Sequence, residues 1–587
     1  MRQFFISMLG TVFGIFVFFI LFFFLIIGIG TIAGLSAADQ SAGKQVLFMD
    51  LRQPVLDHTG AKPIFGAESA SVVNIARSLN RAKKDDSIKG LFIRANEFGM
   101  VPASAEEIRL AILDFKESGK FVITHSQGFE GTTLTPYMAI SASDEIWQQD
   151  TTGFAIAGLR SETGFYGGVF EKYDAKPQFE QFHEYKNAAN VYTQTDYTDA
   201  HRESTNSLLT SLYDSMMAQI STDRKQSTEA VKAVFDTSPH SAEDAKKAGL
   251  IDVLGHYNAA REHAREKAGG KSVKFLPITN YAPKGYVTGP VIAFIGGQGP
   301  VVTGESADSS NPFATSLSMG GDSVAHAFDM AIKDKKVEAI VFRVSTPGGS
   351  PAASDQIHDA VARAKEAGKP VIISMGQYAA SGGYYVAANA DKIVAMPTTI
   401  TGSIGVLGGK IALRDTFAKV GYNIESISKG GDYLGAFSAD EPFTQAQRAA
   451  YRGQLEDIYE DFTQRVADGR DMPIEQVKEI AKGRVWTGAE AKDIGLVDEF
   501  GGILKAIAVA KELVEIEADK EVYLKRFPRP KTTQQQIEEL FGSSVKTSED
   551  LARLSQIMNR SDVKALLEAS TALQGGQELK ADLPDIR

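Results

Sequence analysis

The stretch Gln377-Tyr-Ala-Ala-Ser-Gly-Gly-Tyr-Tyr-Val386 lies between a predicted strand and a predicted helix. A sharp turn of the chain is therefore expected at Ser381. The preceding residues 369–374 are apolar and β-branched, which predicts a buried strand. The following residues 384–390 are rich in alanine and predict the first turns of a helix. A serine at such a junction, followed by two glycines, is expected to have an exposed hydroxyl and a backbone that can bend. Ser381 is therefore a candidate nucleophile, although an ordinary turn explains this stretch equally well.

A second glycine-rich stretch, Arg343-Val-Ser-Thr-Pro-Gly-Gly-Ser350, ends another apolar strand. Gly348 and Gly349 could present backbone N–H groups to an oxyanion, which acyl-transfer chemistry requires beside its nucleophile. Together the two stretches favour the nucleophile interpretation of Ser381.

Composition excludes several other classes of site. The chain has 587 residues, enough for two or more domains, and it is 43% hydrophobic and 23% charged, as folded globular proteins are. Its net charge of −11 argues against nucleic acid as a main partner. The absence of cysteine excludes disulfides, thiolate metal sites and a cysteine nucleophile. The nine histidines show no metal-ligand spacing, so we expect neither a metal site nor another cofactor.

The N-terminus is predicted to be a membrane anchor. Residues 4–38 carry no charge, and residues 12–32 are dominated by Phe, Ile, Leu and Val over a length that can cross a bilayer. Arg2 is the only charge before this segment, which predicts a cytoplasmic N-terminus and a body on the far side of the membrane. The alternative is a cleaved signal peptide, because Leu35-Ser-Ala-Ala38 resembles a cleavage site, but the length favours an uncleaved anchor over residues 1–39.

The rest of the chain contains an internal repeat. Ile88-Lys-Gly-Leu-Phe-Ile-Arg94 matches Val337-Glu-Ala-Ile-Val-Phe-Arg343, and Ala242-Glu-Asp-Ala-Lys-Lys-Ala-Gly-Leu-Ile-Asp252 matches Gly488-Ala-Glu-Ala-Lys-Asp-Ile-Gly-Leu-Val-Asp498 at a similar spacing. In both copies, apolar strands alternate with amphipathic helices such as 357–367, which predicts a parallel α/β fold. The predicted domains are the repeats 40–285 and 286–520 and a tail over 521–587, with helical arms near 198–220 and 445–465.

The two copies differ where chemistry is expected. The stretch Arg94-Ala-Asn-Glu-Phe-Gly99-Met100 lacks the second glycine, and Leu134 falls near the position of Ser381. The second copy alone therefore keeps a possible nucleophile and oxyanion cradle. The serine needs a base, and His358 resembles an ordinary helix residue. A buried lysine can serve, but composition does not choose among the lysines.

These motifs, with Thr401-Gly-Ser-Ile-Gly405, resemble the bacterial signal peptide peptidases of the SppA type, also called protease IV. The duplication, the anchor and the length are similar to the long form of that family, over roughly residues 1–520. The wider superfamily includes ClpP proteases and crotonases, and the resemblance therefore implies spiral α/β repeats of ββα units.

The resemblance also implies a catalytic site divided between the copies. Ser381 would be the nucleophile, and Lys186, in Glu184-Tyr-Lys-Asn-Ala-Ala189, would be the general base. Asn187 departs from the serine that the family has after its lysine. Ser403 would orient the lysine. The backbone N–H groups of Gly349 and Gly382 would hold the oxyanion, with Gly348 shaping the turn.

The function implied is that of a membrane-anchored serine endopeptidase that degrades cleaved, hydrophobic signal peptides. Its place would be the bacterial inner membrane, crossed once, with the catalytic body on the periplasmic side, and its assembly would be a homotetramer. One alternative is a crotonase-like acyl-CoA enzyme, which needs no serine nucleophile and is normally soluble. The other is a non-catalytic membrane scaffold, against which the intact Ser381, Lys186 and Gly348-Gly349 argue.

Overall fold

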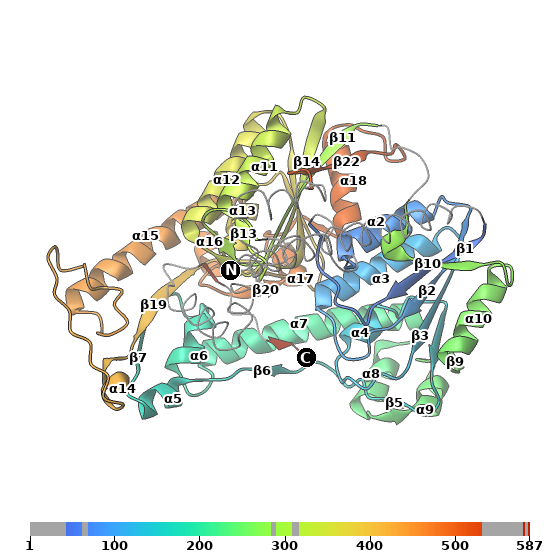
Figure 1. The fold of residues 1–587 in the computed structure, drawn as a ribbon, viewed down its shortest axis with the longest axis horizontal. Coiled ribbons are helices and arrows are strands. Elements are labelled where there is room, and N and C mark those ends of the chain that lie inside the picture. The colour runs from blue at the N-terminus through green and yellow to red at the C-terminus, as the bar shows by residue number, and fades with distance from the viewer. Residues whose placement is uncertain are drawn as a thin grey trace, which may run out of the picture.

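The computed structural model describes residues 43–60, 69–282, 289–307 and 316–530 and two short strands near the C-terminus. It contains two large sheets, one in each predicted repeat, with helices packed on their faces (Figure 1). The first is a parallel sheet in the order β10-β1-β2-β3-β4-β9. Its strands are β1 (Gln45–Asp50), β2 (Ile88–Arg94), β3 (Phe121–Ser126), β4 (Glu145–Gln148), β9 (Val253–Leu254) and β10 (Lys274–Pro277). Its helices are α2 (Val72–Ala82), α3 (Pro102–Lys116), α4 (Thr135–Met138), α7 (Asp199–Arg224), α8 (Thr228–Asp236), α9 (Ala242–Lys247) and α10 (Tyr257–Lys267).

The second sheet has eight strands and follows the same plan. Its main path is β20-β18-β16-β14-β11-β22, parallel except for the antiparallel pair β18–β20, and β17 and β21 extend it from β16. The strands are β11 (Val291–Gln298), β14 (Val337–Thr346), β16 (Val371–Ala380), β17 (Lys392–Ala395), β18 (Ile400–Gly402), β20 (Val485–Thr487), β21 (Glu499–Phe500) and β22 (Tyr523–Phe527). The helices are α11 (Gly321–Lys333), α12 (Pro351–Glu366), α13 (Gly382–Ala387), α15 (Gln445–Arg470), α16 (Ile474–Ile480), α17 (Gly488–Asp493) and α18 (Ile503–Leu513).

Local sequence explains the elements that lead into the serine turn. The β-branched run predicted over 369–374 forms β16, which extends further than predicted and ends directly before Ser381. The amphipathic run 357–367 belongs to α12, which begins with proline at its first position and with Ser350 accepting a hydrogen bond from the backbone of Ala353. Strand and helix types were thus predicted correctly, and their ends were not.

Equivalent side chains make the same contacts in both repeats. The hydroxyl of Tyr137 donates to the carbonyl of Leu250 (2.6 Å), and the hydroxyl of Tyr384 donates to that of Leu496 (2.9 Å). Leu134 precedes α4 as Ser381 precedes α13, which agrees with the position assigned to it by comparing the two copies of the sequence. The structure therefore contains one α/β unit twice.

The two arms are long helices, as predicted, and a strand pair connects the repeats beside them. α7 and α15 cover the predicted arms 198–220 and 445–465. Between α4 and α7 the chain leaves the first sheet and forms β7 (Lys176–Phe182), which pairs antiparallel with β19 (Val406–Ala412) of the second repeat. A segment of the first repeat is thereby held against the second (Figure 1).

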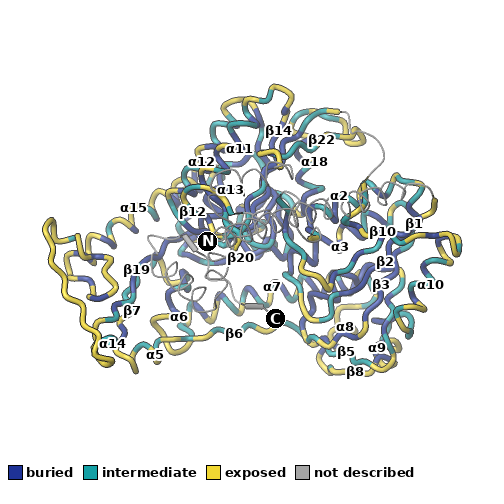
Figure 2. Tube along the Cα trace, in the orientation of Figure 1, coloured by how far each residue is buried: buried dark blue, intermediate teal, exposed yellow. Residues whose placement is uncertain are grey.

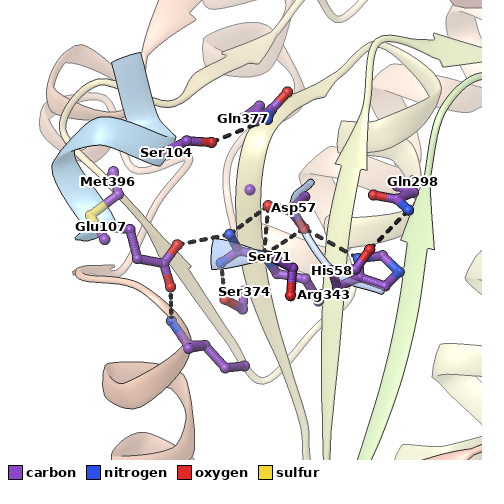
Figure 3. Close-up of polar contacts among 12 residues, drawn as sticks. Asp57, His58, Ser71, Ser104, Glu107, Gln298, Arg343, Ser374, Gln377 and Met396 are labelled. Carbon is purple, nitrogen blue, oxygen red and sulfur yellow. Dashed lines mark hydrogen bonds and ion pairs between the residues drawn. The ribbon is translucent and has the colours of Figure 1, made fainter. Parts of the chain in front are cut away.

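A buried ion network also joins the repeats (Figure 3). The guanidinium of Arg343, on β14, donates to the carboxylates of Asp57 (2.6 Å) and Glu107 (2.7 Å), both from the first repeat. Burial by itself raises the pKa of Asp57, but the Arg343 guanidinium holds it well below its usual range. Because β14 leads to Gly348, this network fixes the strand where it approaches the glycine pair.

Asp57→Asn is expected to lower the free energy of unfolding by about 3–5 kcal/mol, because it leaves Arg343 buried with less compensating charge. Urea unfolding of the purified chain would measure the loss. Asp415→Asn is the matched control, since Asp415 forms an exposed ion pair with Lys176 and its removal should change stability little. Equal effects of the two changes would contradict a stabilising role for the network.

Within the described ranges, no helix is long and apolar enough to cross a membrane. The anchor predicted over residues 1–39 lies outside those ranges. Of the predicted tail after residue 530, the structure describes only β23 (Leu579–Lys580) and β24 (Asp585–Ile586).

Candidate active site

Ser381 lies between β16 and the first turn of α13, with its backbone at φ +55° and ψ −118°. This conformation is sparsely populated for a residue other than glycine and costs about 1–3 kcal/mol. The Ser381 amide donates to the carbonyl of Gly402 (2.8 Å), which helps to hold the turn. The hydroxyl was expected to be exposed, and this expectation was wrong: Ser381 is fully buried. Residues distant in sequence cover it, and Lys186 is one of them.

Lys186 follows β7, and the pairing of β7 with β19 carries it into the second repeat. Its side chain is almost fully buried, and its Nζ lies 2.7 Å from the Oγ of Ser381. Burial of an amine favours its neutral, proton-accepting form. Ser381, the candidate nucleophile from the sequence, and Lys186, the base implied by the family resemblance, therefore lie in contact within one chain, each from a different repeat.

Ser403 lies beside the pair, at the place that the family resemblance implied. The Nζ of Lys186 is 3.0 Å from the Oγ of Ser403 and 2.9 Å from its carbonyl oxygen. Ser403 has a positive φ of +50°, and its amide donates to the carbonyl of Arg484 (2.6 Å). These contacts fix the direction in which the lysine amine points.

The glycine stretch forms a short strand, β15 (Gly348–Gly349), next to the serine turn. A Cβ added to Gly349, at φ +154°, would lie 2.1 Å from the carbonyl oxygen of Val301, on the neighbouring strand β12 (Val301–Val302). A Cβ added to Gly382 would lie 3.2 Å from the amide nitrogen of Gly349. The two backbone amides assigned to an oxyanion are thus neighbours, and only glycine fits at Gly349 without moving β12.

Gly349→Ala is expected to lower peptidase activity at least about tenfold, because the methyl group would displace β15 from β12 and misplace its amide. Steady-state hydrolysis of a fluorogenic peptide measures the loss. Gly368→Ala is the matched control: Gly368 also has a positive φ, +73°, but a Cβ there meets open space. Full activity in Gly349→Ala would contradict the assigned cradle.

The sequence pattern gave no sign of Gly483, whose backbone packs directly against Lys186. At φ +81°, it lies so close that an added Cβ would be 2.5 Å from the Cβ of Lys186. The carbonyl of the preceding Lys482 accepts from the amides of His183 and Tyr185 (both 3.2 Å). Gly483 follows α16 in the second repeat, far in sequence from Lys186, and no local pattern links the two positions.

His358, the other base considered, lies on α12 with its ring edge against Tyr385. Burial lowers the pKa of His358 to about 4, with a further contribution from Arg465. No cluster of potential metal ligands occurs among the described residues. The site thus combines the hydroxyl of Ser381, the amine of Lys186 and neighbouring backbone amides. These groups suit attack of the serine hydroxyl on a carbonyl carbon.

Comparison with known proteins agrees with this chemistry. The sequence profile of Peptidase family S49 matches the chain twice, over residues 115–271 and 363–517. The chain belongs to peptidase family S49. It is therefore a serine peptidase, and the double match confirms the internal repeat found in the sequence.

Relatives match most of the chain. "Serine protease SPPA, chloroplastic" of Arabidopsis thaliana is 30% identical, over 85% of this chain and 74% of its own length. "Protease 4" of Salmonella typhi is also 30% identical, over 84% of this chain and 83% of its own length. Among solved structures, a ClpP1 mutant from Listeria monocytogenes aligns over 36% of this chain and 94% of its own at 13% identity, with a TM-score of 0.23. That score is too low to assign a fold, so the spiral of ββα units stays a prediction.

Proposed function

We propose that this S49 peptidase is a membrane-anchored endopeptidase that degrades cleaved signal peptides with a Ser381–Lys186 dyad. The observation that carries the proposal is the distance of 2.7 Å between the Nζ of Lys186 and the Oγ of Ser381, in a buried setting. Such proximity is required of a nucleophile and its base.

In the proposed mechanism, neutral Lys186 takes the Ser381 proton as the Oγ attacks the peptide carbonyl. The carbonyl oxygen becomes an oxyanion, which accepts hydrogen bonds from the amides of Gly349 and Gly382. Lys186 then donates its proton to the leaving amine, and an acyl-enzyme remains. Water activated by the same lysine hydrolyses the ester and restores the serine. Ser403 keeps the amine pointed at the Oγ throughout.

The edge of β15 supports an extended peptide as the substrate. β23, from the C-terminal tail, pairs with it antiparallel, and Gly349 is opposite Leu579. Backbone pairing of this kind binds an extended chain through its main-chain groups. A substrate that took the place of β23 on this edge would present its backbone to Gly349.

The signal-peptide and membrane parts of the proposal rest on the apolar N-terminal segment and on the family resemblance of the sequence motifs. An anchor over residues 1–39 would hold the site close to apolar peptides left in the bacterial inner membrane, with the catalytic body on the periplasmic side. Association of several copies, which we propose to be a homotetramer, is supported by exposed apolar side chains in the segment that follows α14 (Arg414–Ala418). Val420 (79% exposed), Leu434 (63%) and Tyr422 (56%) are among them. The backbone around α14 and α5 (Gly167–Lys172) forms an exposed tip in Figure 2.

The test uses the full chain in nonionic detergent with synthetic signal peptides as substrates. We expect internal cleavage of the hydrophobic segment, detected by mass spectrometry, and covalent labelling by a fluorophosphonate probe. Polar peptides of the same length serve as the control and should be cleaved more slowly. Labelling without any cleavage of signal peptides would refute the substrate assignment and leave the serine peptidase, whereas neither labelling nor cleavage would favour a scaffold.

A further inference from the structure

Two adjoining cavities meet at helix α2, away from the serine turn. The first has a volume of about 220 Å³ and lies between α2, the segment before it and the turn η3 (Ile278–Asn280). The second has a volume of about 240 Å³ and lies between α2, α18 and β22, which are close together in Figure 1. Arg77 and Arg81, one helical turn apart on α2, line both cavities.

The arginines at this junction repel one another. Burial lowers the pKa of Arg77 to about 10, with smaller contributions in the same direction from Arg81 and Arg526 and an opposing one from Tyr523. Arg526 donates to the carbonyl of Thr59. Among the residues that the structure describes, no carboxylate forms an ion pair with Arg77 or Arg81, and Glu521, at the second cavity, is paired with Lys84 (3.6 Å).

Arg77 and Arg81 are both half-buried. A cation partly removed from water without a counter-charge destabilises a fold, and an anion bound beside it offsets that cost. The lining of the first cavity suits the oxygen atoms of such an anion, because it offers hydroxyl and amide donors as well as guanidinium groups. The polar residues that line it, apart from the two arginines, are Ser69, Ser71, Asn74, Ser78, Thr279 and Tyr281. The hydroxyl of Tyr281 donates to the carboxylate of Asp85 (3.3 Å).

The second cavity has a different character. Its wall combines apolar side chains of α18 and β22 with lysines, so that it suits an apolar chain attached to an anionic group. These residues include Leu504, Ile507 and Leu524 and the basic Lys84, Lys511 and Lys520. Two carboxylates, Asp519 and Glu521, also line the cavity, so that its basic residues outnumber its acidic ones.

We propose that Arg77 and Arg81 bind a phosphate group in the first cavity, either as free phosphate or as the head group of an anionic phospholipid whose chain lies in the second. Arginine is suited to this ligand because its planar guanidinium can donate two parallel hydrogen bonds to phosphate oxygens. The site is separate from the dyad and does not depend on the substrate assigned above.

The test is thermal unfolding of the full chain in nonionic detergent, titrated with inorganic phosphate at constant ionic strength. We expect the midpoint to rise by about 2 °C near saturation. Arg77→Gln and Arg81→Gln should each lose most of that rise. Without phosphate, Arg77→Gln should unfold at the same temperature as the wild type or higher, because it removes an uncompensated cation. A purely structural role of Arg77 would instead lower that temperature.

Arg202→Gln is the matched control, since Arg202 is exposed on α7 and paired with Asp196, and it should keep the full response. A second titration compares short-chain phosphatidylglycerol with diacylglycerol of the same chain length, which lacks the phosphate. Stabilisation by phosphatidylglycerol alone would identify a lipid head group, and stabilisation by both it and phosphate a site open to free phosphate. An equal phosphate response in wild type, Arg77→Gln and Arg81→Gln, or no response of the wild type to either ligand, would overturn the proposal.

Discussion

Ser381→Ala is expected to reduce peptidase activity by a factor of about 10⁴ or more, because it removes the hydroxyl that forms the acyl-enzyme. Hydrolysis of a fluorogenic hydrophobic peptide by the detergent-solubilised chain measures the rate, and a fluorophosphonate probe reports the nucleophile directly. Loss of the Ser381 hydroxyl should leave the fold intact, because the turn is also held by the hydrogen bond from the Ser381 amide to the carbonyl of Gly402.

Ser118→Ala is the control for this experiment. Ser118 lies in the turn after α3, where its hydroxyl donates to the carbonyl of Phe115, and its loss should affect neither rate nor labelling. If Ser381→Ala kept measurable labelling and more than about a hundredth of the activity, another serine would have to be the nucleophile.

Lys186→Met is expected to lower activity by a factor of about 10³–10⁴, because the neutral side chain fills the same space but accepts no proton. Lys186→Arg should be as inactive, since a guanidinium stays protonated. The double variant Ser381→Ala with Lys186→Met should be no worse than Ser381→Ala alone, because the two groups act in one step.

Lys369→Met is the matched control for the lysine. Lys369 is also buried, but its Nζ donates to the carbonyls of Ala331 and Asp334 (both 2.7 Å) in the second repeat, away from the dyad. This variant should lose stability and keep its specific activity. Wild-type activity in Lys186→Met would exclude the dyad and require a search among the remaining lysines and histidines.

Much of the fold could be predicted because its signals are local. The β-branched run before Ser381 and the amphipathic run of α12 are properties of adjacent residues, and each formed the predicted type of element. The internal repeat could be predicted equally well, because it is found by matching stretches of the sequence and needs no knowledge of tertiary contacts. Element ends were less predictable: β16 continues to Ala380 because its neighbours β14 and β18 extend the pairing.

The site was predicted in two different ways. The exposed turn assigned to Ser381 came from its own neighbours in sequence, whereas Lys186 came from a family resemblance, because nothing near residue 186 indicates a base. The burial of Ser381 was missed for the same reason: the atoms that cover it belong to segments far along the chain.

The sequence by itself determined the repeat, the type of its strands and helices, and the one copy that keeps a serine followed by two glycines. Only the tertiary structure decided that β7 pairs with β19, that Gly483 lets the lysine approach, and that Arg343 ties the glycine strand to the first repeat. The physical reason is the separation along the chain of the residues that interact. Periodicity and turn chemistry act over a few residues, whereas these contacts join residues hundreds of positions apart and form only when both repeats have folded and packed.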